Sequence, residues 1–244
     1  MMRISTLTGM VLLCALSGSA LASSSESASV DPWQSFNRGV FRFNETLDKY
    51  IAKPVAKTYQ FVTPTAVDDA ITRVFHNLAT PITIVNQLLQ AKPHDAAGQT
   101  ARLMFNSTLG LGGIIDVAKH MDLPRQKEDF GQTLAVWGVK SGPYVMLPIL
   151  GPSTVRDAGA RIVDRVCDPT QHVERDARLV MTALDMTDTR ADLLNAEKAI
   201  EGDRYAFIRD YYLQQREFAI ADGVLAKDEF LDDSLENDAE SETF

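Results

Sequence analysis

Residues 31–56 read DPWQSFNRGVFRFNETLDKYIAKPVA, and the pattern of this stretch indicates the fold of the chain. Apolar side chains recur along it at intervals of three and four residues, at Phe36, Val40, Phe43, Leu47 and Ile51. This spacing places them on one face of an amphipathic α-helix. Pro54 lacks a backbone N–H, so we expect the helix to end or kink there.

Helical signals continue along most of the chain. Threonine followed by proline, a typical helix start, occurs at 63–64 and 80–81, which predicts one helix through Phe75 and another over 82–89. Further helices are expected at 95–109, 153–167, 173–184, 189–200 and 203–222, with Ser153 and Asp203 as N-caps, a stop at Asp168-Pro169, and Gly223 just past the last end. Residues 144–150 are the best extended segment, and Pro148 restricts them to an edge strand or a loop. The predicted fold class is all-α.

Each apolar stripe is most simply interpreted as part of an ordinary core. The first helix invites a second interpretation, because aromatic residues crowd its start at Trp33, Phe36, Phe41 and Phe43. Aromatic side chains are enriched where a membrane meets water. Burial gives about 1.5–3 kcal/mol per large apolar side chain in either setting, so energy alone does not separate membrane docking from core packing.

The composition bounds the class of protein. The 244 residues are 45% hydrophobic and 23% charged, as in globular proteins, and the net charge of −9 makes nucleic acid an unsuitable partner. Much of the acidity follows Lys227, so we expect residues 228–244 to form an acidic, disordered tail. Two cysteines, Cys14 and Cys167, cannot form a disulfide scaffold.

The N-terminus has the features of a secretory signal. A basic Arg3 precedes an apolar run over 7–16, and Ala20-Leu21-Ala22 fits the small-residue cleavage rule, so we expect residues 1–22 to be removed. Leu13 stands where a lipoprotein signal needs a small residue, so lipid attachment at Cys14 is not expected. A serine-rich flexible leader (23–30) and a single domain (31–227) would follow.

The residues give no support for an enzyme. The four histidines do not form a zinc motif, G-x-S-x-G is absent, and GLGG at 110–113 lacks the rest of a dinucleotide or phosphate loop. We therefore expect no catalytic residue, no metal site and no cofactor. Asp116 and His120 are the one pair that a hydrolytic alternative, a phospholipase, would use as acid and base.

Two glycine-rich segments interrupt the helical pattern, LGLGGII at 109–115 and GVKSGPYVMLPILG at 138–151. Glycine permits positive φ and close approach of the backbone. Irregular apolar backbone is costly unless it is packed inside the protein or lines a cavity. These segments are therefore either packing turns or walls of a cavity.

Long ordered blocks of the chain resemble the MlaA (VacJ) family of outer-membrane phospholipid-transport proteins. Besides residues 31–56, they are FHNLATPITIVNQLLQ (75–90), FNSTLGLGGIIDVA (105–118), DFGQTLAVWGVKSGPYVMLPILGPSTVRDAGA (129–160) and DRYAFIRDYYLQQREFAIADG (203–223). The resemblance implies a helical ring in the inner leaflet of the Gram-negative outer membrane. It also implies a central amphipathic channel for mislocalised phospholipid, trimeric porins as neighbours, and a periplasmic lipid carrier linked to an inner-membrane ABC transporter.

The resemblance also suggests where lipid would touch the chain, since a phospholipid path needs a polar wall beside an apolar surround. Arg38, Asn44 and Lys53 are candidates for head-group contacts, and Leu109 to Gly113 for a flexible wall or hinge, with a plain packing turn as the alternative. The full candidate set is Arg38, Phe41, Phe43, Asn44, Lys53, Leu109, Gly110, Leu111, Gly112 and Gly113. The main alternative to a lipid channel is a scaffold that binds porins and conducts nothing.

Overall fold

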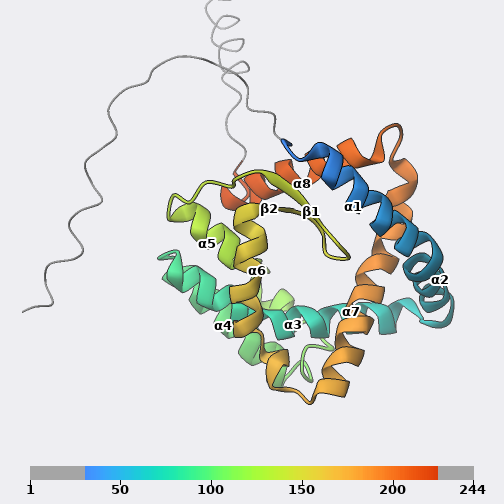
Figure 1. The fold of residues 1–244 in the computed structure, drawn as a ribbon. Coiled ribbons are helices and arrows are strands. Elements are labelled where there is room, and N and C mark those ends of the chain that lie inside the picture. The colour runs from blue at the N-terminus through green and yellow to red at the C-terminus, as the bar shows by residue number, and fades with distance from the viewer. Residues whose placement is uncertain (1–30, 225–244) are drawn as a thin grey trace, which may run out of the picture. The chain divides into compact units, whose positions relative to one another are not determined.

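The computed structural model describes residues 31–224. The expected signal peptide, leader, Cys14 and acidic tail lie outside these residues. The described part is mostly helical, with one small hairpin (Figure 1). Its elements are α1 (Gln34–Leu47), η1 (Asp48–Ala52), α2 (Lys53–Val62), α3 (Thr65–Leu89), α4 (Pro93–Thr108), η2 (Ala118–Met121), α5 (Phe130–Val136), β1 (Tyr144–Leu147), β2 (Gly151–Thr154), α6 (Val155–Cys167), η3 (Pro169–His172), α7 (Arg175–Ala196), η4 (Glu197–Ala199) and α8 (Arg204–Ile220).

The helix end expected at Pro54 is wrong, and the departure from α-helical geometry comes before it, at residues 48–52. Helices α1 and α2 are joined without a break by the π-helical turn η1, in which the Lys53 N–H bonds to the Asp48 carbonyl five residues back. A π-helix is rare and occurs mostly as a single turn inside a longer α-helix. Its wider spacing accommodates the missing N–H of Pro54 near the start of α2.

Two pairs of expected helices are single helices. Helix α3 runs through Pro81, where a new helix start was predicted, and α7 joins the segments expected at 173–184 and 189–200. An interior proline costs about 3 kcal/mol. The packing of α3 along α4, with further contacts to α5, α6 and α7, offsets that cost. Tertiary contacts, which the local sequence does not reveal, therefore keep the helix continuous through Pro81.

The hairpin extends the prediction for residues 144–150. Strands β1 and β2 pair antiparallel from Tyr144↔Thr154 to Leu147↔Gly151, and Pro148 lies in the turn, as its missing N–H requires. Strand β2 was not predicted, because Gly-Pro-Ser-Thr shows no apolar alternation. The prediction that Ser153 caps α6 is wrong: Ser153 lies in β2, and the Thr154 side chain accepts the bond from the Asp157 N–H.

Two asparagines of α1 hold the hairpin. Asn37 Nδ2 donates to the Tyr144 carbonyl (3.1 Å) and its Oδ1 accepts from the Met146 N–H (2.9 Å). One heptad later, Asn44 Nδ2 donates to the Leu147 carbonyl (2.9 Å) and its Oδ1 accepts from the Ile149 N–H (2.8 Å). Side-chain amides thus satisfy the open edge of β1, which backbone groups of a neighbouring strand would otherwise satisfy.

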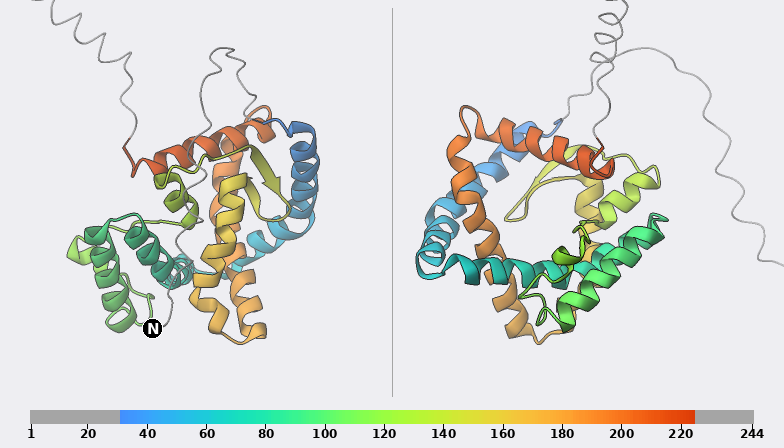
Figure 2. Two further views of the ribbon diagram at one scale, coloured as in Figure 1. Left: turned by 60° about the vertical axis from the view of Figure 1, so that its left-hand side comes forward. Right: turned by 180° about the vertical axis from the view of Figure 1, so that it is seen from behind.

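The helices pack mainly in pairs: α2 on α7, α3 on α4, and α5 on α6. The hairpin contacts α1 through β1, and α6 and α8 through β2 (Figure 2). Tyr144 and Met146 of β1 form a small buried cluster with Tyr205 of α8, and Phe41 packs edge-on to the Tyr205 ring at 5.6 Å between centroids. These contacts position the polar groups described below.

Burial in the described part is inverted relative to an ordinary core. The buried apolar side chains are few, and several are alanines, whereas the buried polar and charged ones outnumber them: Asp31, Asn37, Asn77, Thr83, Asn86, Gln87, Gln90, Gln99, Arg102, Asn106, Glu128, Gln132, Thr133, Ser153, Thr154, Arg156, Asp157 and Asp188. The apolar stripe of α6, expected to be core, is exposed instead, with Ile162 at 70% and Val166 at 74%. Periodicity located the stripes but not the side they face.

We predict that Asn37→Ala lowers the free energy of unfolding by about 2–3 kcal/mol, because the Tyr144 carbonyl and the Met146 N–H of β1 would lose their hydrogen-bond partner. Denaturant unfolding of the detergent-solubilised protein measures this. Gln34→Ala, at an exposed position of the same helix, is the matched control and should change stability by less than about 0.5 kcal/mol. An equal loss of stability in the two variants would contradict the role of Asn37 in holding the hairpin.

Candidate functional site

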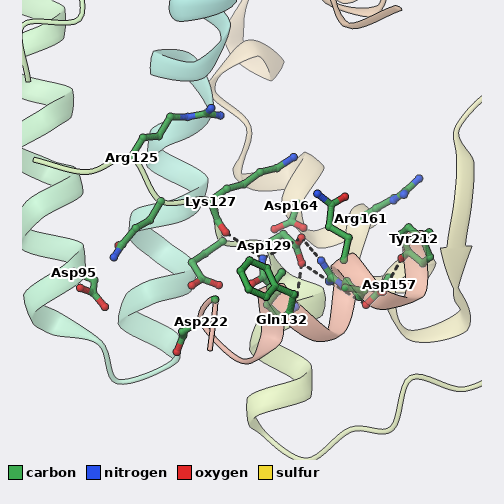
Figure 3. A pocket seen from close by; sticks show the side chains of 17 residues that line it. Asp95, Arg125, Lys127, Asp129, Gln132, Asp157, Arg161, Asp164, Tyr212 and Asp222 are labelled. Carbon is green, nitrogen blue, oxygen red and sulfur yellow. Dashed lines mark hydrogen bonds and ion pairs between the residues drawn. The ribbon is translucent and has the colours of Figure 1, made fainter. Parts of the chain in front are cut away.

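A polar cavity of about 670 Å³ lies between the start of α4, the segment 125–129, and helices α5, α6 and α8 (Figure 3). Its lining is dominated by charged and amide side chains: Asp95, Arg125, Gln126, Lys127, Glu128, Asp129, Gln132, Asp157, Arg161, Asp164, Gln215, Arg216 and Asp222. Cavities that bind drug-sized ligands are mostly apolar. This one instead carries charges of both signs, with six acidic and four basic side chains in its lining.

Arg216 of α8 is the central charge of the polar cavity. Its guanidinium bonds to both carboxylate oxygens of Asp129 (2.6 Å each) and to Asp157 (3.0 Å) (Figure 3). Tyr212 donates to Asp157 at 2.8 Å, and Arg156 Nε does so at 2.9 Å. One arginine therefore ties α8 to the first turns of α5 and α6, which makes the wall of the cavity rigid.

Gly131 makes this approach possible. A Cβ at this position would lie against Arg216 Nη2 and 2.5 Å from Asp157 Oδ1. Asp129, two residues earlier, caps α5 by accepting from the Gln132 N–H at 3.0 Å. The short sequence DFGQ at 129–132 thus supplies a helix cap, an ion-pair partner and the space for a guanidinium.

The acids of the cavity titrate differently. Burial opposes ionisation of Asp129 and Asp157, but the hydrogen bonds and charges of their arginine partners hold both pKa values below the ordinary range. Burial raises the pKa of Asp164, which lies near the charge of Asp129 and accepts only from the Phe130 N–H and Asn86. The wall therefore carries fixed charges beside a carboxyl group that protonates more readily.

The predicted glycine-rich wall, Leu109 to Gly113, is a hydrogen-bonded turn packed on α3. Asn77 Nδ2 donates to the Gly112 carbonyl at 3.2 Å, and a Cβ on Gly113 would lie 2.7 Å from Asn77 Cβ. A Cβ on Gly110 would overlap the Ile115 carbonyl oxygen, whereas Gly112 (φ +75°) has open space around it. Leu109 and Leu111 are exposed. The geometry contains features of both a packing turn and an exposed edge, so the hinge role stays a prediction.

The polar candidates of α1 and α2 are engaged in links between helices. Arg38 pairs with Asp203 at the start of α8 (2.6 Å) and lies 4.5 Å from the centre of the Tyr205 ring. Lys53 bonds to Glu197 at 2.5 Å, and Asn44 holds the hairpin turn. These three do not meet in one place within the described residues. Their predicted contact with lipid head groups remains untested.

The aromatic candidates separate into two environments. Phe41 packs against the buried cluster that includes Tyr205. Phe43 is exposed, as are Trp33 and Phe36. Exposed apolar side chains continue along α2, where Phe61 is 90% exposed, and along α6 and α7. Within residues 31–224, no helix combines the length and the apolar character needed to cross a membrane.

The pair Asp116 and His120, considered for hydrolysis, is not assembled as acid and base. Asp116 accepts from Arg102 at 2.9 and 3.0 Å and from Asn106 at 3.0 Å, while His120 is exposed on η2. Burial opposes ionisation of Asp116, but the Asn106 and Arg102 bonds lower its pKa. The carboxylate serves as a structural anchor between α4 and the glycine-rich turn.

The ion pairs of Arg216 at the centre of the polar cavity were not predicted from the sequence. Arg216 and Asp129 are 87 positions apart in sequence, and Arg216 and Asp157 are 59 apart, so no local spacing links them. The one signal that was available is Asp129 followed three residues later by Gln132, a typical helix-capping pattern.

Comparison with known proteins shows which family the chain is similar to. A family profile described as MlaA lipoprotein matches residues 29–219. The chain is 32% identical over 220 residues to the intermembrane phospholipid transport system lipoprotein MlaA of Escherichia coli K12, covering 88% of each chain, and 31% identical over 241 residues to the Haemophilus influenzae protein of that name, covering 94% of this chain and 96% of that protein. A solved structure from work on the structural basis for maintenance of bacterial outer membrane lipid asymmetry matches with a TM-score of 0.70 and 33% identity, covering 78% of this chain and 98% of the other.

The ion pairs around Lys53 make a pH-dependent prediction. Burial alone would raise the pKa of Glu197, but its bonds to Lys53 and Arg190 lower it from 4.5 to about 2. The folded state thus favours the ionised form, so this contribution to stability is complete above pH 4.5 and is lost as the pH falls toward 2.

Glu197→Gln should therefore destabilise the protein most near neutral pH, and the difference from wild type should shrink between about pH 5 and pH 2. Unfolding measured across this range tests it. Glu201→Gln, at an exposed position nearby, is the control and should show no such dependence. A constant difference for Glu197→Gln would contradict the assignment.

Proposed function

The chain belongs to the MlaA lipoprotein family, and from this membership we propose that it is the outer-membrane component of an intermembrane phospholipid transport system. In this role it removes mislocalised phospholipid from the outer leaflet and so maintains the lipid asymmetry of the outer membrane. It acts as a transport component and not as an enzyme. The lipid passes through chemically unchanged.

The inverted burial is the observation that best supports this proposal. Amide and charged groups fill the interior, while large apolar side chains cover the exterior of α1, α2, α6 and α7. Helices satisfy their own backbone hydrogen bonds, so such a body is stable with lipid around its sides. We propose that it forms a helical ring in the periplasmic leaflet, with an amphipathic channel inside it.

We propose that the polar cavity forms the hydrophilic side of the phospholipid path. A phospholipid could pass its head group along the charged wall around Arg216, while its acyl chains follow apolar surface. Arg38, Asn44 and Lys53 remain proposed head-group contacts, and Phe41 and Phe43 proposed apolar contacts. The turn from Leu109 to Gly113 is the proposed hinge or wall.

The proposed partners follow from the same membership. Trimeric porins would hold the protein in the outer membrane, and a periplasmic lipid carrier would pass the lipid to an inner-membrane ABC transporter. Because the sequence shows no nucleotide-binding motif, we propose that these partners supply the energy. The protein would reach its location as the single domain 31–227, after removal of residues 1–22 and with an acidic tail.

We predict that a strain lacking the protein accumulates phospholipid in the outer leaflet and becomes sensitive to detergent. Enzymatic labelling of surface-exposed phospholipid measures the first effect, and growth in detergent the second. Normal surface lipid in the deletion strain would overturn the transport role. Lipid that co-purifies with the detergent-extracted protein separates this role from the alternative of a porin-bound scaffold that conducts nothing.

Gly112→Val tests the proposed hinge. A Cβ at this position has no neighbouring atom within 4 Å, but a residue with a side chain at φ +75° is strained by about 1–2 kcal/mol. The fold should survive, and lipid passage and detergent sensitivity should change. Gly159→Val, in open space on α6, is the control. Wild-type behaviour of a folded Gly112→Val protein would favour the packing turn over the hinge.

A further inference from the structure

A second, smaller hollow lies beside the polar cavity, between α3 and α4. It measures about 30 Å³, and we call it the basic hollow. Its lining consists of Arg73, His76, Asn77, Thr80, Arg102, Asn106, Asp116 and Arg125. Arg125 also lines the polar cavity, so this side chain stands between the two spaces.

Positive charge exceeds negative charge in the basic hollow. The only acid in its lining, Asp116, is bonded by Arg102 through both carboxylate oxygens. Arg73 donates to the Ile114 carbonyl at 2.9 Å and lies 3.9 Å from Asp69 on its own helix. The Arg125 side chain is exposed, and within residues 31–224 it makes no side-chain hydrogen bond or ion pair, although the charge of Asp116 acts on it.

The titration of neighbouring groups reflects this imbalance. Partial desolvation and the charge of Arg102 lower the pKa of Arg125. Burial, followed by the charges of Arg125 and Lys127, lowers the pKa of His76 to about 4. His76 is therefore neutral at pH 7 and keeps one ring N–H to donate. The site repels protons and should attract an anion.

The size of the hollow selects among anions. One buried water needs about 10–15 Å³ on this measure, so about 30 Å³ accepts two oxygen-sized atoms. A phosphodiester has two unbridged oxygens, and a guanidinium binds such a pair with two parallel N–H bonds. The remainder of a head group would not fit in the basic hollow, but the adjoining polar cavity has room for it.

We propose that the basic hollow binds the phosphate of a phosphodiester anion, with Arg125 as its principal ligand and Arg102, Arg73 and His76 around it. That this phosphate belongs to a phospholipid rests on the proposed function. In that role the hollow recognises the one chemical group that diacyl phospholipids share and that neutral lipids lack. It binds the phosphate and leaves the rest of the head group in the polar cavity.

The test uses the full mature chain in a phosphate-free maltoside detergent, with the His76 ring followed by NMR. Three probes are compared: short-chain dihexanoyl phosphatidylglycerol, dihexanoylglycerol, and inorganic phosphate. We expect the phosphatidylglycerol to raise the pKa of His76 and dihexanoylglycerol to leave it unchanged. Arg125→Gln should raise the Kd for phosphatidylglycerol, read from this change at His76, about tenfold or more. Arg165→Gln, an exposed position on α6, is the charge-matched control and should respond like wild type.

A free-protein measurement guards against misfolding. In the free Arg125→Gln protein the pKa of His76 should rise above about 4 but stay below 6.5, because burial is the largest cause that lowers it, whereas exposure of His76 in a misfolded variant would return the pKa to 6.5. No response to either phosphate compound, an equal response to dihexanoylglycerol, or equal weakening in both variants would overturn the proposal. A response to inorganic phosphate alone would keep the anion site and overturn its assignment to lipid.

The outcome is separable from that of the proposed function. If lipid transfer proceeds but the pKa of His76 does not change with phosphatidylglycerol, the phosphate site in the basic hollow alone is contradicted. A His76 response in a protein whose deletion leaves surface lipid normal would contradict the transport role alone.

Discussion

Pairing of buried charges and amides is the constraint on which the structure depends. Truncating one partner of a buried ion pair typically costs 3–5 kcal/mol, because an uncompensated charge remains. Arg216 satisfies two carboxylates from two other helices, and Arg102 and Arg190 make comparable links elsewhere. Large apolar side chains cover the exposed faces of α1, α2, α6 and α7, so these buried charges find their partners within the chain.

The helices were largely predictable from the sequence, and their surroundings were not. The apolar spacing from Phe36 to Ile51 and in the segment 153–167 falls on helices α1, η1 and α6, and Asp203 caps α8 as expected. The same spacing is compatible with a stripe that faces a core and with one that faces outward, so the stripe of α6 was assigned to a core although its side chains are exposed. Pro54 and Pro81 misled for a related reason: packing and a π turn offset a local cost.

The site was predictable only where it is local. The glycines of 110–113 mark a real turn, and Asn44 is a real polar anchor, although it bonds the hairpin backbone. The charge network joins α5, α6 and α8 across long stretches of chain, and its arginine and aspartates look like ordinary surface residues in the sequence. Asn37, fully buried, was missed because one asparagine on a helix face carries no pattern of its own.

The π turn η1 gives the long rod formed by α1, η1 and α2 one place where its length can change. Its hydrogen bonds span five residues where those of an α-helix span four, so the turn holds one residue more than a continuous α-helix needs. Deletion of one residue between Asp48 and Ala52 would therefore convert the turn into an ordinary α turn, with Asn37 and Asn44 still bonded to the hairpin and Ala56 still facing α7. A deletion within α1 or α2 would instead rotate the rest of the rod by about 100°, so one-residue gaps in the alignment of relatives should fall within the π turn.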